Sequence, residues 1–198
     1  MIWFLVCNAV PSRTISVVYL VVKHLALLLL ATGVAWPATV DLSGNARDPF
    51  ASPAQVRVFV FVRTDCPITN RYAPELRRLA AAFSGVEVWM VYPDASETPD
   101  QIRRHMMDYS LPGHVLRDPH HELVKRSHVT IAPEAAVFDS ENRLVYHGRI
   151  DDLWVNPGIS RAVARTHELE EAIAAVLEGK PVKLAETHAI GCSLADVQ

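Results

Sequence analysis

The sequence contains little cysteine and no block rich in lysine or arginine. Its three cysteines, Cys7, Cys66 and Cys192, are too few for a scaffold built on disulfides. The missing basic block and a net charge of -3 argue against nucleic acid as a partner. The chain has 198 residues, of which 50% are hydrophobic and 21% are charged. It is therefore long and apolar enough for one domain with a core, and this composition excludes an intrinsically disordered chain.

The apolar residues are concentrated at the start of the chain. Lys23 and His24 form a basic flank, residues 25–34 form an apolar core, and the small residues "GVA" end at Ala35. This arrangement is typical of a signal peptide with its cleavage site. We therefore predict that residues 1–35 are a signal peptide and that the protein is exported to the periplasm or the extracellular space.

A membrane anchor is the alternative for this segment. Residues 15–34 are about as long as a bilayer span requires, although Lys23 lies in their middle. An anchor would give the protein an N-terminal association with the membrane. Cleavage would instead remove Cys7 and leave Cys66 and Cys192 in a compartment that permits disulfides.

The rest of the chain alternates between strand and helix patterns. β-Branched and aromatic runs predict strands, and apolar residues at helical spacing predict helices. The early strand–helix–strand order favours parallel pairing, whereas two late strands joined by "SEN" indicate an antiparallel hairpin. The predicted fold class is therefore α/β, with a mixed sheet covered by helices. The predicted strands cover residues 55–62, 86–92, 114–118, 134–139 and 143–150, and the predicted helices cover 70–83, 98–110, 120–129 and 161–180.

No internal repeat and no linker divides residues 50–180. We predict an extended lead-in at 36–54, a single domain at 55–180 and a polar C-terminal tail at 181–198.

The stretch "FVRTDCPITNRYAPEL" places Cys66 between an apolar strand and a helix. Pro67 suits the first helical position, so Cys66 is predicted at the N-cap, where a helix terminus lowers the pKa of a thiol. Asp65 opposes this effect, because a neighbouring carboxylate raises a thiol pKa. Thr69, one turn further on, could donate its hydroxyl to a thiolate or a sulfenate. The alternative to this reactive thiol is an inert, buried cysteine.

Three segments of the chain carry a family resemblance. An apolar strand is followed by "CPIT" and then by Pro74, "VTIAPEAAVFD" contains Pro133 directly before a strand, and "FDSENRLVYHGRIDD" forms a hairpin. These segments resemble the thiol motif, the cis-proline loop and the hairpin of the thioredoxin-like redoxins, which include the alkyl hydroperoxide reductase/thiol-specific antioxidant proteins and exported thiol-disulfide oxidoreductases. The resemblance implies a thioredoxin-like three-layer fold, with helices on both faces of a mixed sheet and a cis-Pro133 facing Cys66.

The motif departs from this family at two positions. Peroxiredoxins carry T-x-x-C, but here Thr64 stands two residues before Cys66. Thioredoxins carry a second cysteine where this chain has Thr69, so C-x-x-T replaces C-x-x-C. The first departure weighs against peroxidase activity, and the second excludes a disulfide inside the motif.

Cys192 lies outside the predicted core, in the tail sequence "AIGCS". Gly191 gives the backbone freedom there, which suits a mobile resolving cysteine. The tail is long enough to fold back across the domain, although a disulfide also needs Cα atoms within about 7 Å. A free tail thiol and a bond between two chains are the alternatives.

The resemblance implies a thiol-based redox protein, either a thiol-disulfide oxidoreductase or a peroxiredoxin-like antioxidant. Cys66 would be the redox thiol, Cys192 would resolve the product, and Pro133 would shape the groove for the substrate backbone. The partners would be a protein disulfide or peroxide substrate and a thiol reductant. This function requires no cofactor.

Thioredoxin-like copper assembly proteins provide a second hypothesis. Cys66, His167, His188 and Cys192 could form a soft site of nitrogen and sulfur ligands for copper, although the C-x-x-x-C usual in that branch is missing. A module that only binds a partner is a third hypothesis. His105 is expected on a helix surface, outside any of these sites.

Overall fold

The computed structural model describes residues 39–194 of the chain. The predicted signal peptide or membrane anchor at 1–35 and Cys7 lie outside the described residues, as do residues 36–38 and 195–198. Within the described part, no helix combines the length and the apolar character needed to cross a membrane.

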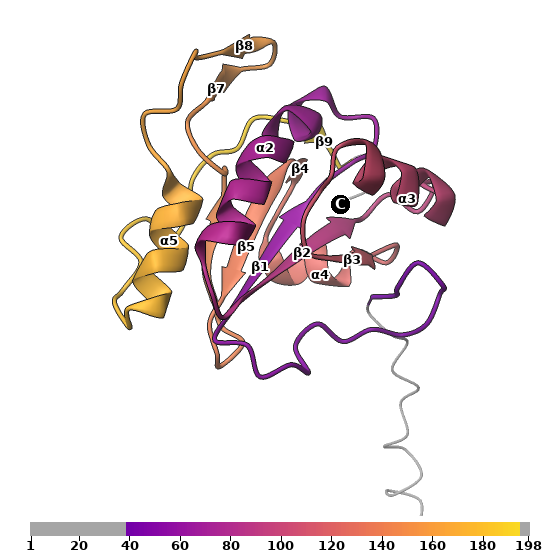
Figure 1. Cartoon of the computed structure of the whole chain (residues 1–198), viewed down its shortest axis with the longest axis horizontal. Helices are drawn as coiled ribbons and strands as arrows, with labels where there is room; N and C mark the ends of the chain where they lie inside the picture. The colour runs from indigo at the N-terminus through magenta and orange to yellow at the C-terminus, as the bar shows by residue number, and fades with distance from the viewer. Residues whose placement is uncertain (1–38, 195–198) are drawn as a thin grey trace, which may run out of the picture. The chain divides into compact units, whose positions relative to one another are not determined.

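A five-stranded mixed sheet forms the centre of the described domain (Figure 1). Its strands follow the order β3-β2-β1-β5-β6. Strand β2 pairs in parallel with β1 and β3, whereas β5 pairs antiparallel with β1 and β6. This pattern confirms both the predicted crossover and the predicted hairpin. The strands are β1 (Val56–Phe61), β2 (Val86–Tyr92), β3 (His114–Arg117), β5 (Glu134–Phe138) and β6 (Leu144–Gly148).

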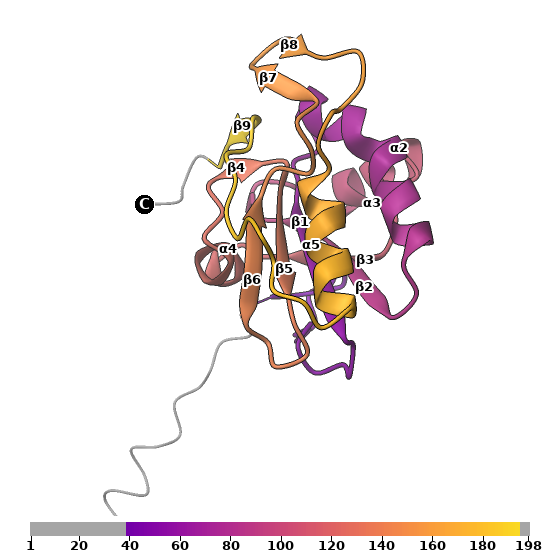
Figure 2. The ribbon, with the colours of Figure 1, turned by 90° about the vertical axis from the view of Figure 1, so that its left-hand side faces the viewer.

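Helices cover both faces of this sheet (Figures 1 and 2). α2, α3 and α5 pack on one face, where Leu76, Ile102 and Ile173 share a core with β1. The short helix α4 packs on the other face, where Leu123 and Val124 belong to a second core. This arrangement confirms the predicted thioredoxin-like three-layer fold. The helices are α2 (Pro67–Ala82), α3 (Pro99–Asp108), α4 (Glu122–Ser127) and α5 (Glu168–Leu177).

Strand β1 is buried on both of its faces. Val58 and Val60 belong to the core beneath α2, whereas Phe59 and Phe61 belong to the core beneath α4. Successive residues of a strand face opposite sides, so a strand covered on both sides needs a continuous apolar run. The end of β1, where the predicted thiol motif begins, is therefore fixed between two cores.

The C-terminal tail folds back over the domain after α5. The N–H of His147 donates to the carbonyl of Ala185 (2.9 Å), and the N–H of Thr187 donates to the carbonyl of His147 (3.1 Å). The tail thus covers the edge strand β6. Beyond this point, strand β9 (Cys192–Ser193) pairs antiparallel with β4 (Ile131–Ala132), and Figure 2 shows the two side by side. The other short strands are β7 (Trp154–Asn156) and β8 (Ile159–Ser160).

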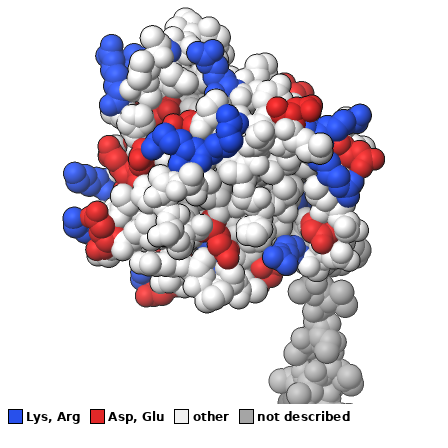
Figure 3. Space-filling model, in the orientation of Figure 1, with Lys and Arg blue, Asp and Glu red and all other residues white. Residues whose placement is uncertain are grey.

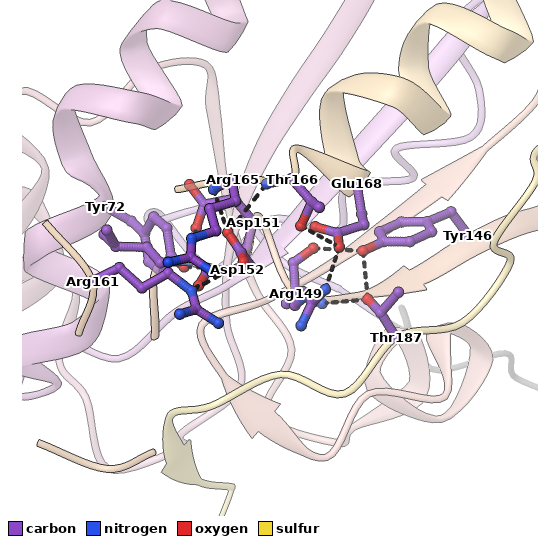
Figure 4. A network of polar contacts seen from close by, with 11 residues as sticks. Tyr72, Tyr146, Arg149, Asp151, Asp152, Arg161, Arg165, Thr166, Glu168 and Thr187 are labelled. Atoms are coloured by element: carbon purple, nitrogen blue, oxygen red, sulfur yellow. Dashed lines mark hydrogen bonds and ion pairs between the residues drawn. The ribbon is translucent and has the colours of Figure 1, made fainter. Parts of the chain in front are cut away.

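Helix α5 begins at Glu168 and not at Arg161, so the first part of the helix predicted at 161–180 is wrong. The carboxylate of Asp152 accepts hydrogen bonds from the backbone N–H groups of Arg165 (2.5 Å) and Thr166 (3.2 Å). It also forms an ion pair with Arg161 (3.0 Å), as Figure 4 shows. These contacts keep the segment out of the helix, because the bonded N–H groups are directed at Asp152.

The first turn of α5 is tied to β6 and to the tail (Figure 4). Glu168 is buried and pairs with Arg149, and it accepts a hydrogen bond from the Thr166 hydroxyl (2.7 Å). Burial opposes ionisation of Glu168, but the hydrogen bonds from Arg149 and Thr166 hold its pKa below the usual value. The Tyr146 hydroxyl lies 2.7 Å from the Thr187 hydroxyl, which also accepts from the N–H of Arg149. The tail is therefore anchored to the domain well before it reaches β4.

His105 is buried inside the domain, with 4% of its surface exposed, and the prediction of a surface position is wrong. Its Nδ1 lies 2.8 Å from the Tyr92 hydroxyl, and its Nε2 lies 2.7 Å from Asn70 Oδ1. Because the amide oxygen can only accept, Nε2 carries the proton and Nδ1 accepts from Tyr92. Burial lowers the pKa of His105. The chain of hydrogen bonds reaches the thiol motif, since the N–H of Asn70 donates to the carbonyl of Cys66 (3.2 Å).

Charged side chains of both signs are interspersed on the face drawn in Figure 3. They are spread over the upper part, the sides and the lower part of this face, with uncharged areas between them. This face therefore presents a mixed surface without an extended area of one sign.

Candidate functional site

Cys66 lies at the junction between β1 and α2, as the motif predicts. It is the N-cap residue of α2, and Pro67 follows at the start of the helix. Cys66 is 0% exposed and its side chain makes no capping hydrogen bond. The unpaired N–H groups and the dipole of a helix N-terminus favour negative charge at this position. A thiolate of Cys66 would therefore be stabilised by α2 and shielded from water.

The loop before β5 lies against this sulfur. The Ala132–Pro133 peptide bond is cis, as the family resemblance implies. The carbonyl oxygen of Ala132 lies 3.3 Å from Cys66 Sγ. The next residue, Pro133, is buried. The structure thus brings the thiol and the cis-proline loop together, and the catalytic role of Pro133 stays a prediction.

A buried carboxylate that the sequence analysis missed holds this loop in place. Glu134 accepts hydrogen bonds from the backbone N–H groups of Thr130 (2.9 Å) and Ile131 (3.3 Å). Burial raises the pKa of Glu134, while these bonds and the nearby His147 (3.6 Å) act in the opposite direction. The sequence feature that could have identified Glu134 is its position directly after the predicted cis-proline.

Cys192 lies at disulfide distance from Cys66, with the two Cα atoms 6.2 Å apart. The pairing of β9 with β4 places Cys192 opposite Ala132, the residue whose carbonyl faces the Cys66 sulfur. Cys192 is half-buried, whereas Cys66 is fully buried. The tail therefore supplies the second sulfur that Thr69 cannot supply within the motif.

Arg63 connects the thiol loop to the tail. Its guanidinium pairs with Asp65 (3.0 Å) and with Asp94 (3.6 Å), and it donates to the carbonyl of Ser193 (3.1 Å). The charge of Asp65 is thus compensated by Arg63. The sequence alone did not predict this ion pair. Ser193 directly follows Cys192, so Arg63 helps to hold the second sulfur at the site.

Two further polar groups lie buried near the motif. Thr69 is 0% exposed, and within residues 39–194 its hydroxyl has no hydrogen-bond partner. Glu97 accepts a hydrogen bond from the N–H of Thr64 (2.6 Å), and burial raises its pKa. Nothing in the sequence singled out Glu97, because its contact with Thr64 bridges two loops that are distant along the chain.

The histidines proposed as copper ligands lie in other surroundings. Among the described residues, one group of at least three His, Cys, Asp or Glu has all its ligand atoms within 4.8 Å of one another, and it consists of Glu75, Asp151 and His167. His188 is exposed in the tail and lines a pocket together with His128 and other residues. The structure therefore does not gather His167 or His188 with the two cysteines.

The sheet order, the cis-proline loop and the cysteine at a helix N-terminus define a thioredoxin-like redoxin. A family model described as the AhpC/TSA family matches residues 43–147, which is more than half of the chain. The protein therefore belongs to the AhpC/TSA family. A search of curated proteins found no match.

Solved structures share this fold. A hypothetical protein from Sinorhizobium meliloti is 25% identical, with a TM-score of 0.67 over 80% of this chain and 91% of that chain. An uncharacterized conserved protein from Geobacillus kaustophilus is 24% identical, with a TM-score of 0.67 over 79% of this chain and 86% of that chain. A secreted disulfide oxidoreductase from Mycobacterium tuberculosis is 21% identical, with a TM-score of 0.51 over 69% of this chain and 93% of that chain.

Proposed function

We infer that the protein is a thiol-disulfide oxidoreductase in which Cys66 and Cys192 alternate between a dithiol and a disulfide. The observation that carries this function is the placement of both sulfurs at disulfide distance beside the cis-Pro133 loop. The membership in the AhpC/TSA family supports the same chemistry. The predicted export agrees with it, because an oxidising compartment would form this bond.

Reduction of the protein begins at Cys192. Cys192 is the more accessible of the two residues, since it is half-buried whereas Cys66 is 0% exposed. The thiolate of an external reductant attacks Cys192 Sγ, and the electron pair of the broken bond leaves on Cys66, where the N-terminus of α2 stabilises the thiolate. A second reductant thiol then releases Cys192 from the mixed disulfide as a free thiol.

Oxidation of the protein begins at Cys66. Its thiolate attacks one sulfur of a substrate disulfide, and the other substrate sulfur leaves as a thiolate. Cys192 then attacks the sulfur of Cys66, so that the first disulfide forms again and the substrate leaves reduced. As the substrate leaves, the pairing of β9 with β4 forms again around the restored disulfide.

Reduction of insulin by dithiothreitol tests this function, with wild type compared to Cys66→Ser and Cys192→Ser. We expect wild-type turnover, loss of activity in Cys66→Ser, and a mixed disulfide with insulin that accumulates in Cys192→Ser. Equal turnover by wild type and Cys66→Ser would disprove the function. A parallel assay of hydrogen peroxide consumption tests the peroxiredoxin-like alternative, which the position of Thr64 does not favour.

No observation on the described residues specifically favours copper handling. Of the four residues suggested as ligands, the two cysteines lie together, and His167 is grouped with Glu75 and Asp151. A chain that binds copper through Cys66 and Cys192 would do so without the predicted histidines.

A further inference from the structure

The end of the tail occupies a cradle beside the thiol. Residues 192–193 pair with β4 as an antiparallel strand, and the N–H of Leu194 donates to the carbonyl of Thr130 (3.3 Å). Leu194 itself is 6% exposed and belongs to the core beneath α4. Ala189, on the other side of the cysteine, is 3% exposed. An extended segment centred on a cysteine is thus bound along its backbone and at both ends.

Most of these contacts do not depend on which chain supplies the segment. The bonds to β4 and to Arg63 involve backbone groups of the tail, and an extended peptide of another protein offers the same groups. The Cys66–Cys192 bond is the part that fixes the tail covalently. When this bond is reduced, the tail remains only as a tethered competitor for the cradle.

One position of the cradle is selective for a small residue. A Cβ at Gly191 would lie 2.2 Å from the carbonyl oxygen and 2.6 Å from the carbonyl carbon of Ala132. Both are backbone atoms of β4, whose position is fixed by the bonds from Thr130 and Ile131 to Glu134. The cradle therefore excludes a side chain directly before the bound cysteine.

We propose that the tail is a built-in copy of the substrate, and that the cradle binds partner polypeptides in which glycine directly precedes the reacting cysteine. An apolar residue two positions after the cysteine takes the place of Leu194. This inference rests on the proposed function and adds a substrate class to it, namely extended polypeptides with the pattern Gly-Cys-x-apolar.

The test follows the attack of peptide thiols on Cys66. In the full chain with Cys7→Ser and Cys192→Ser, Cys66 is first converted to its mixed disulfide with 5-thio-2-nitrobenzoate. A peptide thiolate attacks the sulfur of Cys66, forms a peptide–Cys66 disulfide and releases the yellow thionitrobenzoate anion with the electron pair. The probes are the peptide Ala-Ile-Gly-Cys-Ser-Leu, which copies residues 189–194, and the matched peptide Ala-Ile-Val-Cys-Ser-Leu. Reaction of both peptides with free dithionitrobenzoate corrects for their intrinsic reactivity.

We expect the glycine peptide to react at least tenfold faster than the valine peptide after this correction. We also expect the glycine peptide to react faster still when Gly191→Val is added to the protein, because that substitution removes the competing tail from the cradle. Equal corrected rates for the two peptides would overturn the inference while leaving the proposed function intact. Glutathione separates the two claims, because a Cys66 that reacts with neither glutathione nor the peptides would overturn both.

Discussion

The bond between Cys66 and Cys192 should contribute strongly to stability. The two cysteines are 126 residues apart in sequence, so their bond closes most of the domain into one loop. In the chain-entropy model a loop of this length lowers the entropy of the unfolded chain enough to stabilise the folded state by about 5 kcal/mol. Reduction of the protein should remove this contribution.

Urea denaturation of the oxidised and the reduced protein measures the effect. With a denaturant slope of about 2 kcal/mol per molar urea, the loss corresponds to a midpoint lower by about 2.5 M. Cys7→Ser is used as the background, so that Cys66 and Cys192 are the only thiols. Cys192→Ser without reductant is the matched control, and its urea midpoint should equal that of the reduced protein.

A small difference in stability between the oxidised and the reduced protein would contradict this expectation. If oxidised and reduced protein differ by less than about 1 kcal/mol, the closed loop does not constrain the unfolded chain as the entropy model requires. If the urea midpoint of Cys192→Ser instead equals that of the oxidised protein, the two cysteines are not bonded to each other in solution.

Three further predictions concern buried polar groups of the domain. Replacing Asp152 by alanine should lower the free energy of unfolding by about 2 to 3 kcal/mol, because two backbone N–H groups and Arg161 lose a charged acceptor. An unchanged urea midpoint would contradict this expectation. His105 should titrate below its unfolded value and carry its proton on Nε2 in the neutral form, which NMR of the imidazole nitrogens can measure. Since its folded pKa is lowered, its contribution to stability is present above the unfolded value of about 6.5 and should be lost as the pH falls from there through the folded pKa. A folded pKa at the unfolded value would refute the assignment. Replacing Glu134 by alanine should speed amide hydrogen exchange at residues 130 and 131, and unchanged protection there would show that the carboxylate does not hold the loop.

Local sequence patterns were sufficient for the parts of the fold that depend on near neighbours. The apolar run around Val58 and Val60 predicted a buried strand, and the structure confirms it. Pro67 after Cys66 identified the start of a helix, and α2 begins there. The cis-proline at Pro133 came from the family resemblance, since no local pattern distinguishes a cis from a trans bond.

The remaining features depend on contacts between distant residues. Strands β4 and β9 have two residues each, too few for a periodic pattern, and they form because the tail returns to the thiol. The helical pattern after Arg161 was overridden by Asp152, which binds the backbone of this segment. His105 lies one turn after the buried Ile102 on the same helix, and its ring contacts Tyr92 and Asn70, which belong to other elements. No window of sequence contains these partners together.

We propose that Cys66 and Cys192 form one reversible redox pair within a single chain. It is tested most directly by equilibrating the protein in glutathione buffers of graded potential, trapping free thiols with an alkylating agent and weighing the intact chain. We expect two alkyl groups to be lost together in one two-electron transition, and we expect this transition to disappear in both Cys66→Ser and Cys192→Ser. A chain that keeps both alkylated thiols in oxidising buffer, or that forms only disulfide-linked dimers, would contradict it.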